Sequence, residues 1–119
     1  MKVKSYKDLD VWNKGIEIVD LVYEITLRFP DEEKFGLAAH MRKTALSIPS
    51  NIAEGFVRNH TKEYVQFCYI ALGSCSELNT QSIVAHRQKY VSGEDFTRLE
   101  ECLDHESRML MNLIKSLCK

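Results

Sequence analysis

The sequence predicts an all-α fold, an antiparallel up-down-up-down four-helix bundle in which residues 1–119 form one domain. Three observations lead to this prediction. The chain has 119 residues and a mass of 13.8 kDa, enough for one compact domain. Hydrophobic residues make up 45% and charged residues 28%, which is typical of a chain that buries a core. Two prolines and five glycines are too few for a sandwich of many short strands.

The first helix is expected from about residue 8 to residue 29, because Pro30 cannot continue a helix interior. Its apolar residues form two adjacent stripes at helical spacing. One stripe is Trp12, Ile16, Val19, Tyr23 and Thr26, and the other is Val11, Ile18, Val22, Ile25 and Phe29. A helix in a small monomer usually needs one such face. Two stripes therefore predict neighbours on both sides, within the bundle and across subunits of an oligomer.

The second helix is expected to begin at residues 30–33, where a proline precedes three acids that suit a helix N-terminus. Its apolar stripe is Leu37, Met41, Ala45, Ile48 and Ile52, and its polar stripe is Lys43, Ser47, Asn51, Glu54 and Arg58. Pro49 lies inside this pattern, removes one backbone hydrogen bond and crowds the carbonyl of Ala45. Because the period continues beyond Pro49, we expect a kink there, with Gly55 as the exit from the helix.

The third helix is expected from Thr61, as N-cap, to about residue 90, with Glu63 in its first turn. Its inner stripe is Tyr64, Cys68, Ala71, Cys75, Leu78, Ser82 and Ala85. Residues 64–72 are apolar nearly all round and would also suit a strand, but the helical period continues beyond them.

The fourth helix is expected to begin at Ser92, an N-cap followed by acids in the first turn. Its apolar face is Phe96, Leu99, Leu103, Leu110, Leu113 and Leu117, with Met109 and Ile114 beside it.

The N-terminus has no apolar run of signal-peptide length, and the longest apolar stretch, residues 67–72, is far shorter than the roughly 20 residues of a membrane span. We therefore expect a cytoplasmic protein without a membrane partner.

The cysteines are Cys68, Cys75, Cys102 and Cys118. Cys68 and Cys75 would be about 10 Å apart along one helix, too far for a disulfide, and no pair has zinc-ligand spacing. Reduced, mostly buried thiols are expected.

No motif of a nucleophile elbow, a phosphate-binding loop or a dinucleotide site occurs in the sequence. Glu101 and His105 are one helical turn apart and are the only pair weighed as metal ligands, since no glutamate lies three residues before a histidine. Two ligands without a matching pair make a weak metal site, and a solvent-facing pair is the alternative. We therefore expect a protein that is not an enzyme and has no cofactor.

Charge leaves two interpretations of the segment from residue 34 to residue 62. Sixteen Lys and Arg against seventeen Asp and Glu give a net charge of −1, which excludes a domain that is basic overall. Within the segment, the candidate nucleic-acid contacts are Lys34, Arg42, Lys43, Arg58 and Lys62, and Glu54 is the only acid. The flanking acids at 31–33 and 63 cancel this excess, which favours an ordinary solvated face. Repetition of the patch in an oligomer would favour phosphate contacts.

Residues 47–55, with the sequence SIPSNIAEG, resemble the four-helix-bundle proteins first noted as reading frames in 23S rRNA intervening sequences, historically labelled small ribosomal proteins. The resemblance includes Arg42 and Lys43, the segments 6–12 and 35–37, and the segment 69–78. It implies an antiparallel bundle that assembles as a homo-oligomer, a pentamer in known relatives. A more distant relative is the accessory variability protein of diversity-generating retroelements, a pentameric barrel that binds nucleic acid and a reverse transcriptase.

The family pattern extends to Arg42 and to a motif of Pro49, Ser50, Asn51, Glu54 and Gly55. Many members continue after the glycine with several basic residues, whereas this chain keeps only Arg58 there. We interpret the motif as structural: Asn51 would bond a carbonyl that Pro49 leaves unpaired, and Glu54 would pair with a cation on a neighbouring helix. The resemblance implies a family of unestablished activity. Our expectation is a non-catalytic accessory or binding protein for RNA or DNA, and the alternative is a scaffold that docks a partner protein.

Overall fold

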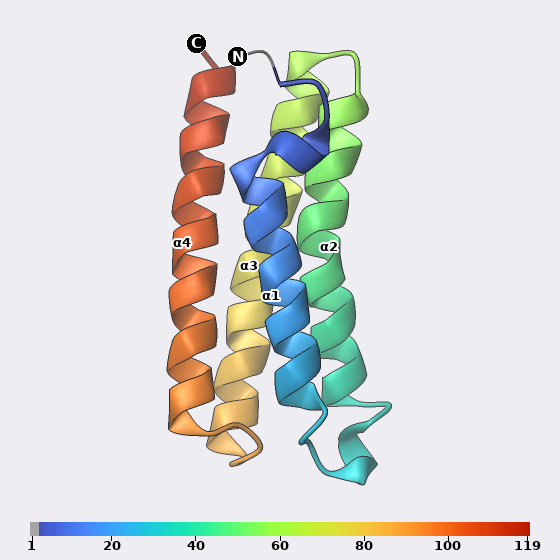
Figure 1. Cartoon of the computed structure of the whole chain (residues 1–119), viewed down its shortest axis with the longest axis vertical. Helices are drawn as coiled ribbons and strands as arrows, with labels where there is room; N and C mark the ends of the chain where they lie inside the picture. Colours follow the sequence, from blue (N-terminus) through green and yellow to red (C-terminus); the bar gives the residue numbers. More distant parts are fainter. Residues whose placement is uncertain (1–2) are drawn as a thin grey trace.

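The computed structural model describes residues 3–119 as a bundle of four helices, α1 (Asp10–Thr26), α2 (Leu37–Val57), α3 (Thr61–Arg87) and α4 (Gly93–Leu117) (Figure 1). Short 3-10 turns lie at Tyr6–Asp8 and Asp31–Glu33. No strand occurs within the described residues, so the predicted all-α class and four-helix bundle are confirmed. That residues 1–119 form a single domain stays a prediction. Residues 1–2 of this predicted domain lie outside the described part of the chain.

Each helix packs against the helix before it, and α4 also packs against α1, so the helices enclose one core (Figure 1). The bundle measures 44 × 23 × 21 Å. The predicted inner stripes of α2 and α3 are buried or half-buried throughout. Both stripes of α1 are used, because α1 contacts α2 and α4, although Tyr23 stays exposed.

The helix ends differ from the sequence prediction in several places, beginning with α1, which ends at Thr26 and not at residue 29. The acids at 31–33 form a separate 3-10 turn, and α2 begins only at Leu37 because Gly36, with φ −105° and ψ −114°, is not helical. Glu33 still serves the helix, since its Oε1 accepts a hydrogen bond from the Leu37 amide at 3.2 Å. Thr61 is the first residue of α3 and not its N-cap, because His60 has the extended backbone of that position.

Gly55 is not the exit from α2, since the helix continues to Val57. It allows α3 to approach instead. A β-carbon on Gly55 would lie 2.7 Å from the β-carbon of Phe67 and 3.3 Å from the backbone oxygen of Tyr64. Pro49 is buried inside a helix that runs without interruption on both sides of it. The kink at Pro49 and the antiparallel order of the helices stay predictions.

The predicted N-cap of α4 is present, since Ser92 Oγ accepts a hydrogen bond from the Asp95 amide at 3.1 Å. All four cysteines are free; Cys68 and Cys75 are buried, Cys102 is half-buried and Cys118 is exposed. Among residues 3–119, no helix contains an apolar segment long enough to cross a membrane.

Candidate functional site

The five predicted nucleic-acid contacts do not form one patch. Lys34, Arg42 and Lys43 lie before and within the first turns of α2, whereas Arg58 and Lys62 lie at its connection to α3. Arg42 and Arg58 are sixteen positions apart, which corresponds to roughly 24 Å along a helix. One subunit therefore presents two separate basic clusters.

Arg58 is the least available cation of the five. Its Nε lies 3.5 Å from Glu54 Oε2, one turn earlier in the chain, and its guanidinium carbon is 5.1 Å from the centre of the Phe67 ring. Glu54 thus pairs within its own chain segment, and the predicted ion pair with a neighbouring helix is wrong. Lys43 and Lys62 are exposed and, among residues 3–119, belong to no ion pair.

Arg42 is held by α1. Its Nε donates a hydrogen bond to Thr26 Oγ1 at 2.8 Å, and its guanidinium carbon lies 4.8 Å from the centre of the Tyr23 ring. Thr26 is buried, and its hydroxyl donates in turn to the Val22 carbonyl at 2.7 Å. Lys34 lines the same pocket as Arg42, where α1 ends and the chain turns toward α2. The structure thus brings these two predicted residues together.

The motif around Pro49 contributes to the contact between α2 and α3. Asn51 Nδ2 donates to the Ser47 carbonyl at 2.7 Å, so its partner is not the carbonyl of Ala45, which is the one that Pro49 leaves unpaired. Ser47 Oγ in turn lies 2.7 Å from Ser74 Oγ on α3. Asn51 is half-buried, whereas Ser50 is exposed. The polar stripe of α2 therefore faces α3 at Ser47.

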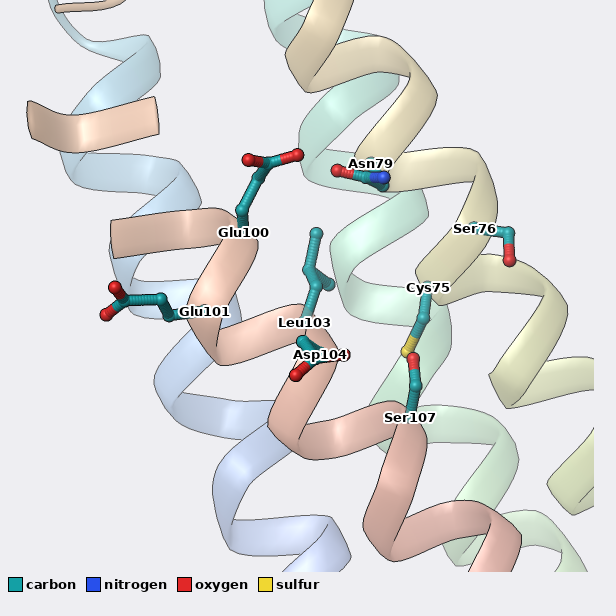
Figure 2. A pocket seen from close by; sticks show the side chains of 8 residues that line it. All are labelled: Cys75, Ser76, Asn79, Glu100, Glu101, Leu103, Asp104 and Ser107. Carbon is teal, nitrogen blue, oxygen red and sulfur yellow. The ribbon is translucent and has the colours of Figure 1, made fainter. Parts of the chain in front are cut away.

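A hollow of about 430 Å³ lies between α3 and α4, and its charge is acidic. Glu100, Glu101 and Asp104 line it from α4, and the Asn79 amide faces Glu100 from α3 (Figure 2). Coulomb repulsion disfavours a phosphate in a hollow lined by three carboxylates and no cation. The hollow is therefore unsuited to nucleic acid.

The thiol of Cys75 points toward Ser107 at the inner side of this hollow (Figure 2). Burial raises the pKa of Cys75 to about 12, and the nearby Glu106 adds to the rise. The thiol is protonated at neutral pH and lacks the thiolate that nucleophilic chemistry requires.

Glu106 is a buried carboxyl that is not among the residues predicted from the sequence. It occupies the apolar face of α4 between Leu103 and Leu110, is 0% exposed, and neither oxygen has a hydrogen-bond partner among residues 3–119. A β-carbon on Gly15 would lie 3.3 Å from Glu106 Oε2 and 3.3 Å from Pro49, so the lack of a side chain on α1 makes room for the carboxyl. The signal in the sequence was a charged residue at a position where the helical period requires an apolar one.

Burial raises the pKa of Glu106 to about 8; Lys14 lowers it and Glu17 raises it further. Glu106 is therefore mainly protonated at neutral pH. Because it is enclosed and offers a single carboxyl, it contributes to the core and not to a surface site.

The pair weighed as metal ligands is not gathered at one site. Glu101 lines the hollow between α3 and α4, whereas His105 lines a different hollow with Lys14 and Glu17. In the part of the chain that the structure describes, no group of three or more His, Cys, Asp or Glu side chains is placed to hold a metal ion.

Comparison with known proteins gives a family and a fold. The family model of the 23S rRNA-intervening sequence protein matches residues 7–112. A solved structure of a protein with unknown function from the S23 ribosomal protein family of Bacteroides thetaiotaomicron superposes with a TM-score of 0.82 at 20% sequence identity, covering 88% of this chain and 95% of that one. No curated protein matches the chain.

Proposed function

Because the chain belongs to the 23S rRNA-intervening sequence protein family, we propose that it is a non-catalytic, self-associating helical bundle that binds RNA or DNA through basic residues of α2 and its flanking turns. The observation that carries the proposal is the pairing state of these cations. Of the five, Lys34, Arg42, Lys43 and Lys62 form no ion pair within the described chain, although acids are abundant on the surface. Unpaired cations are available for phosphates at no cost of breaking a salt bridge.

Exposed apolar side chains support the self-association. On α3, Tyr69 is 52% exposed, and Ile70, Ile83 and Val84 are exposed as well. Leu46 and Val57 add apolar surface on α2. Large exposed apolar side chains on two helices that pack against each other favour an interaction surface there. Assembly would repeat both basic clusters around the oligomer, so that phosphate contacts add across subunits although each subunit has a net charge of −1. By its family resemblance we propose a pentamer.

We expect the cytoplasm as the compartment of this assembly, on the sequence grounds given above. A sedimentation experiment at micromolar concentration tests the assembly by itself. A mass well above 13.8 kDa supports self-association, and a mass near 13.8 kDa refutes it.

Nucleic-acid binding is tested by gel-shift titration of structured RNA and of duplex DNA at low and high salt. Phosphate contacts require affinity to fall as salt rises, by a slope of roughly 0.9 in log–log form for each phosphate neutralised on duplex DNA. The double variant Lys43→Gln/Lys62→Gln should bind more weakly and show a smaller slope. Lys115→Gln, which removes an exposed lysine of α4, is the matched control and should bind like the unmodified protein. Absence of binding at low salt would refute this part of the proposal.

A protein-interaction scaffold is the second candidate, and the same exposed apolar surface favours it. A pull-down distinguishes the two. Recovery of one defined protein, unchanged by nuclease treatment, supports the scaffold, whereas loss of all captured material after nuclease treatment supports the nucleic-acid partner.

A further inference from the structure

The pocket between the end of α1 and the start of α2 has the composition of an anion site. It has a volume of about 200 Å³, and two cations, Lys34 and Arg42, line it together with one acid, Asp31. Phe29, Pro30 and Ala38 contribute to its other walls. The formal charge of the residues that line the pocket is therefore positive, which favours an anion.

Arg42, which lines this pocket, is held in one orientation by α1. The hydrogen bond from its Nε to Thr26 Oγ1 at 2.8 Å and the Tyr23 ring at 4.8 Å hold the plane of the guanidinium. Of its five N–H groups, only the one on Nε has a partner in the described chain. The two terminal nitrogens form no ion pair, so their four N–H groups are available to a ligand. A fixed guanidinium fork matches two oxygens of a phosphate.

Lys34 supplies the second charge. It is exposed, and its Nζ lies 5.7 Å from the centre of the Phe35 ring without an ion pair among residues 3–119. Lysine acts as a mobile point charge, whereas arginine fixes geometry. The carboxylate of Asp31 repels an anion, and the charge of Lys34 offsets it. The net positive charge of the pocket therefore equals that of Arg42.

We propose that this pocket binds a phosphate group, with Arg42 as the bidentate ligand and Lys34 as the second cation. The proposal deepens the proposed function, on which it rests for the source of the phosphate: the backbone of a nucleic acid. A free phosphate or a mononucleotide carries the same chemistry and would enter the same pocket.

The test is a titration of the ¹⁵N-labelled full chain with inorganic phosphate, followed by amide and Arg Nε resonances at constant ionic strength. Sodium chloride in place of phosphate is the salt control. Two or three charge-assisted hydrogen bonds at a partly exposed site predict saturable binding at about 1–10 mM. The largest shifts should occur at residues 26–31 and at the Arg42 Nε. Shifts that do not saturate, or that chloride reproduces, would overturn the proposal.

Variants assign the site. Arg42→Gln should weaken phosphate binding by about tenfold or more, and Lys34→Gln by about threefold, whereas Lys115→Gln on α4 should stay within about twofold of the unmodified protein. If the spectrum of Arg42→Gln lacks the dispersion of a folded chain, the phosphate affinity of Lys34→Gln tests the site instead, because the exposed side chain of Lys34 is not needed for the fold. Unchanged affinity in Lys34→Gln would then overturn the proposal.

The gel shift with structured RNA and duplex DNA separates the two proposals when it compares the unmodified protein with Arg42→Gln, or with Lys34→Gln if Arg42→Gln does not fold. Phosphate binding that depends on Arg42, with no binding of either nucleic acid, supports the pocket and refutes the proposed function. RNA binding that is equal in both proteins, with no saturable phosphate shifts, refutes the pocket and leaves the proposed function in place. Loss of both RNA and phosphate affinity in the variant supports both.

Discussion

The buried carboxyl of Glu106 predicts that the folded chain loses stability as the pH rises. The pKa of Glu106 is raised from its ordinary value of 4.5 to about 8 in the folded state, chiefly by burial. Below about pH 4.5 the carboxyl is protonated in both states, and its titration has no effect on unfolding. Between about pH 4.5 and 8 the unfolded chain releases the proton while the folded chain keeps it, so the free energy of unfolding falls. Above about pH 8 both states are ionised and the effect is complete.

The interval between these two pKa values corresponds to a loss of up to roughly 5 kcal/mol, at about 1.4 kcal/mol for each pH unit. This is a large share of the 5–15 kcal/mol that typically stabilises a domain. Glu106→Gln replaces the carboxyl with a neutral group of the same shape. At pH 7 the variant should be more stable than the unmodified protein by up to about 3 kcal/mol, and by more at pH 9.

Urea unfolding followed by circular dichroism, at pH 5, 7 and 9 and at one protein concentration, measures these free energies. The difference between the unmodified protein and Glu106→Gln isolates one carboxyl, because all other groups titrate in both. Glu101→Gln removes an exposed carboxyl from the same helix and should follow the unmodified protein at each pH. A difference between the unmodified protein and Glu106→Gln that is constant from pH 5 to pH 9 would refute the reasoning.

Three further predictions concern packing, capping and thiol accessibility. Gly55→Ala should destabilise the fold by about 1–3 kcal/mol in urea unfolding, because the added methyl would lie 2.7 Å from a side chain of α3. Gly73→Ala is its matched control: nothing lies within 4 Å of the added group, and a gain of up to about 1 kcal/mol is expected, so equal effects of the two changes would contradict the packing argument. Ser92→Ala should cost about 1 kcal/mol through the lost N-cap of α4, and Ser92→Asn should restore most of it; an unchanged midpoint for the alanine variant would show that the cap contributes nothing. In a thiol-labelling time course, exposed Cys118 should react first and buried Cys75 only on unfolding, so rapid labelling of Cys75 in the folded chain would contradict its burial.

The helices of this fold are predictable from local pattern, because the apolar residues that face the core recur at the helical period. The stripe from Met41 to Ile52 shows this, since each of its members is buried. Helix ends depend on single backbone conformations, and the break at Gly36 is not visible in a periodicity. The sequence pattern predicts Gly55 as a helix exit, whereas its role is set by the distance to α3, which depends on tertiary packing.

For the candidate site, the sequence predicts which basic residues take part but not the contacts that orient them. Sequence spacing identified Arg42 and Lys34 as basic residues of one segment, but Thr26 and Tyr23, which orient the guanidinium, come from the preceding helix. No spacing rule connects side chains on two helices before their packing is known. The burial of Glu106, in contrast, is predictable from the sequence alone, because this residue occupies a position of the apolar stripe of α4.

The order in which the helices touch one another has a consequence for folding speed. Each helix packs on the helix before it, and within residues 3–119 only the contact of α4 with α1 joins segments from opposite ends of the chain. A topology dominated by local contacts is associated with folding in microseconds to milliseconds. The exception is the α1–α4 seam, whose formation closes the longest loop of the chain and carries the greatest entropic cost. We therefore expect the α1–α4 seam to form last in refolding and to open first in unfolding.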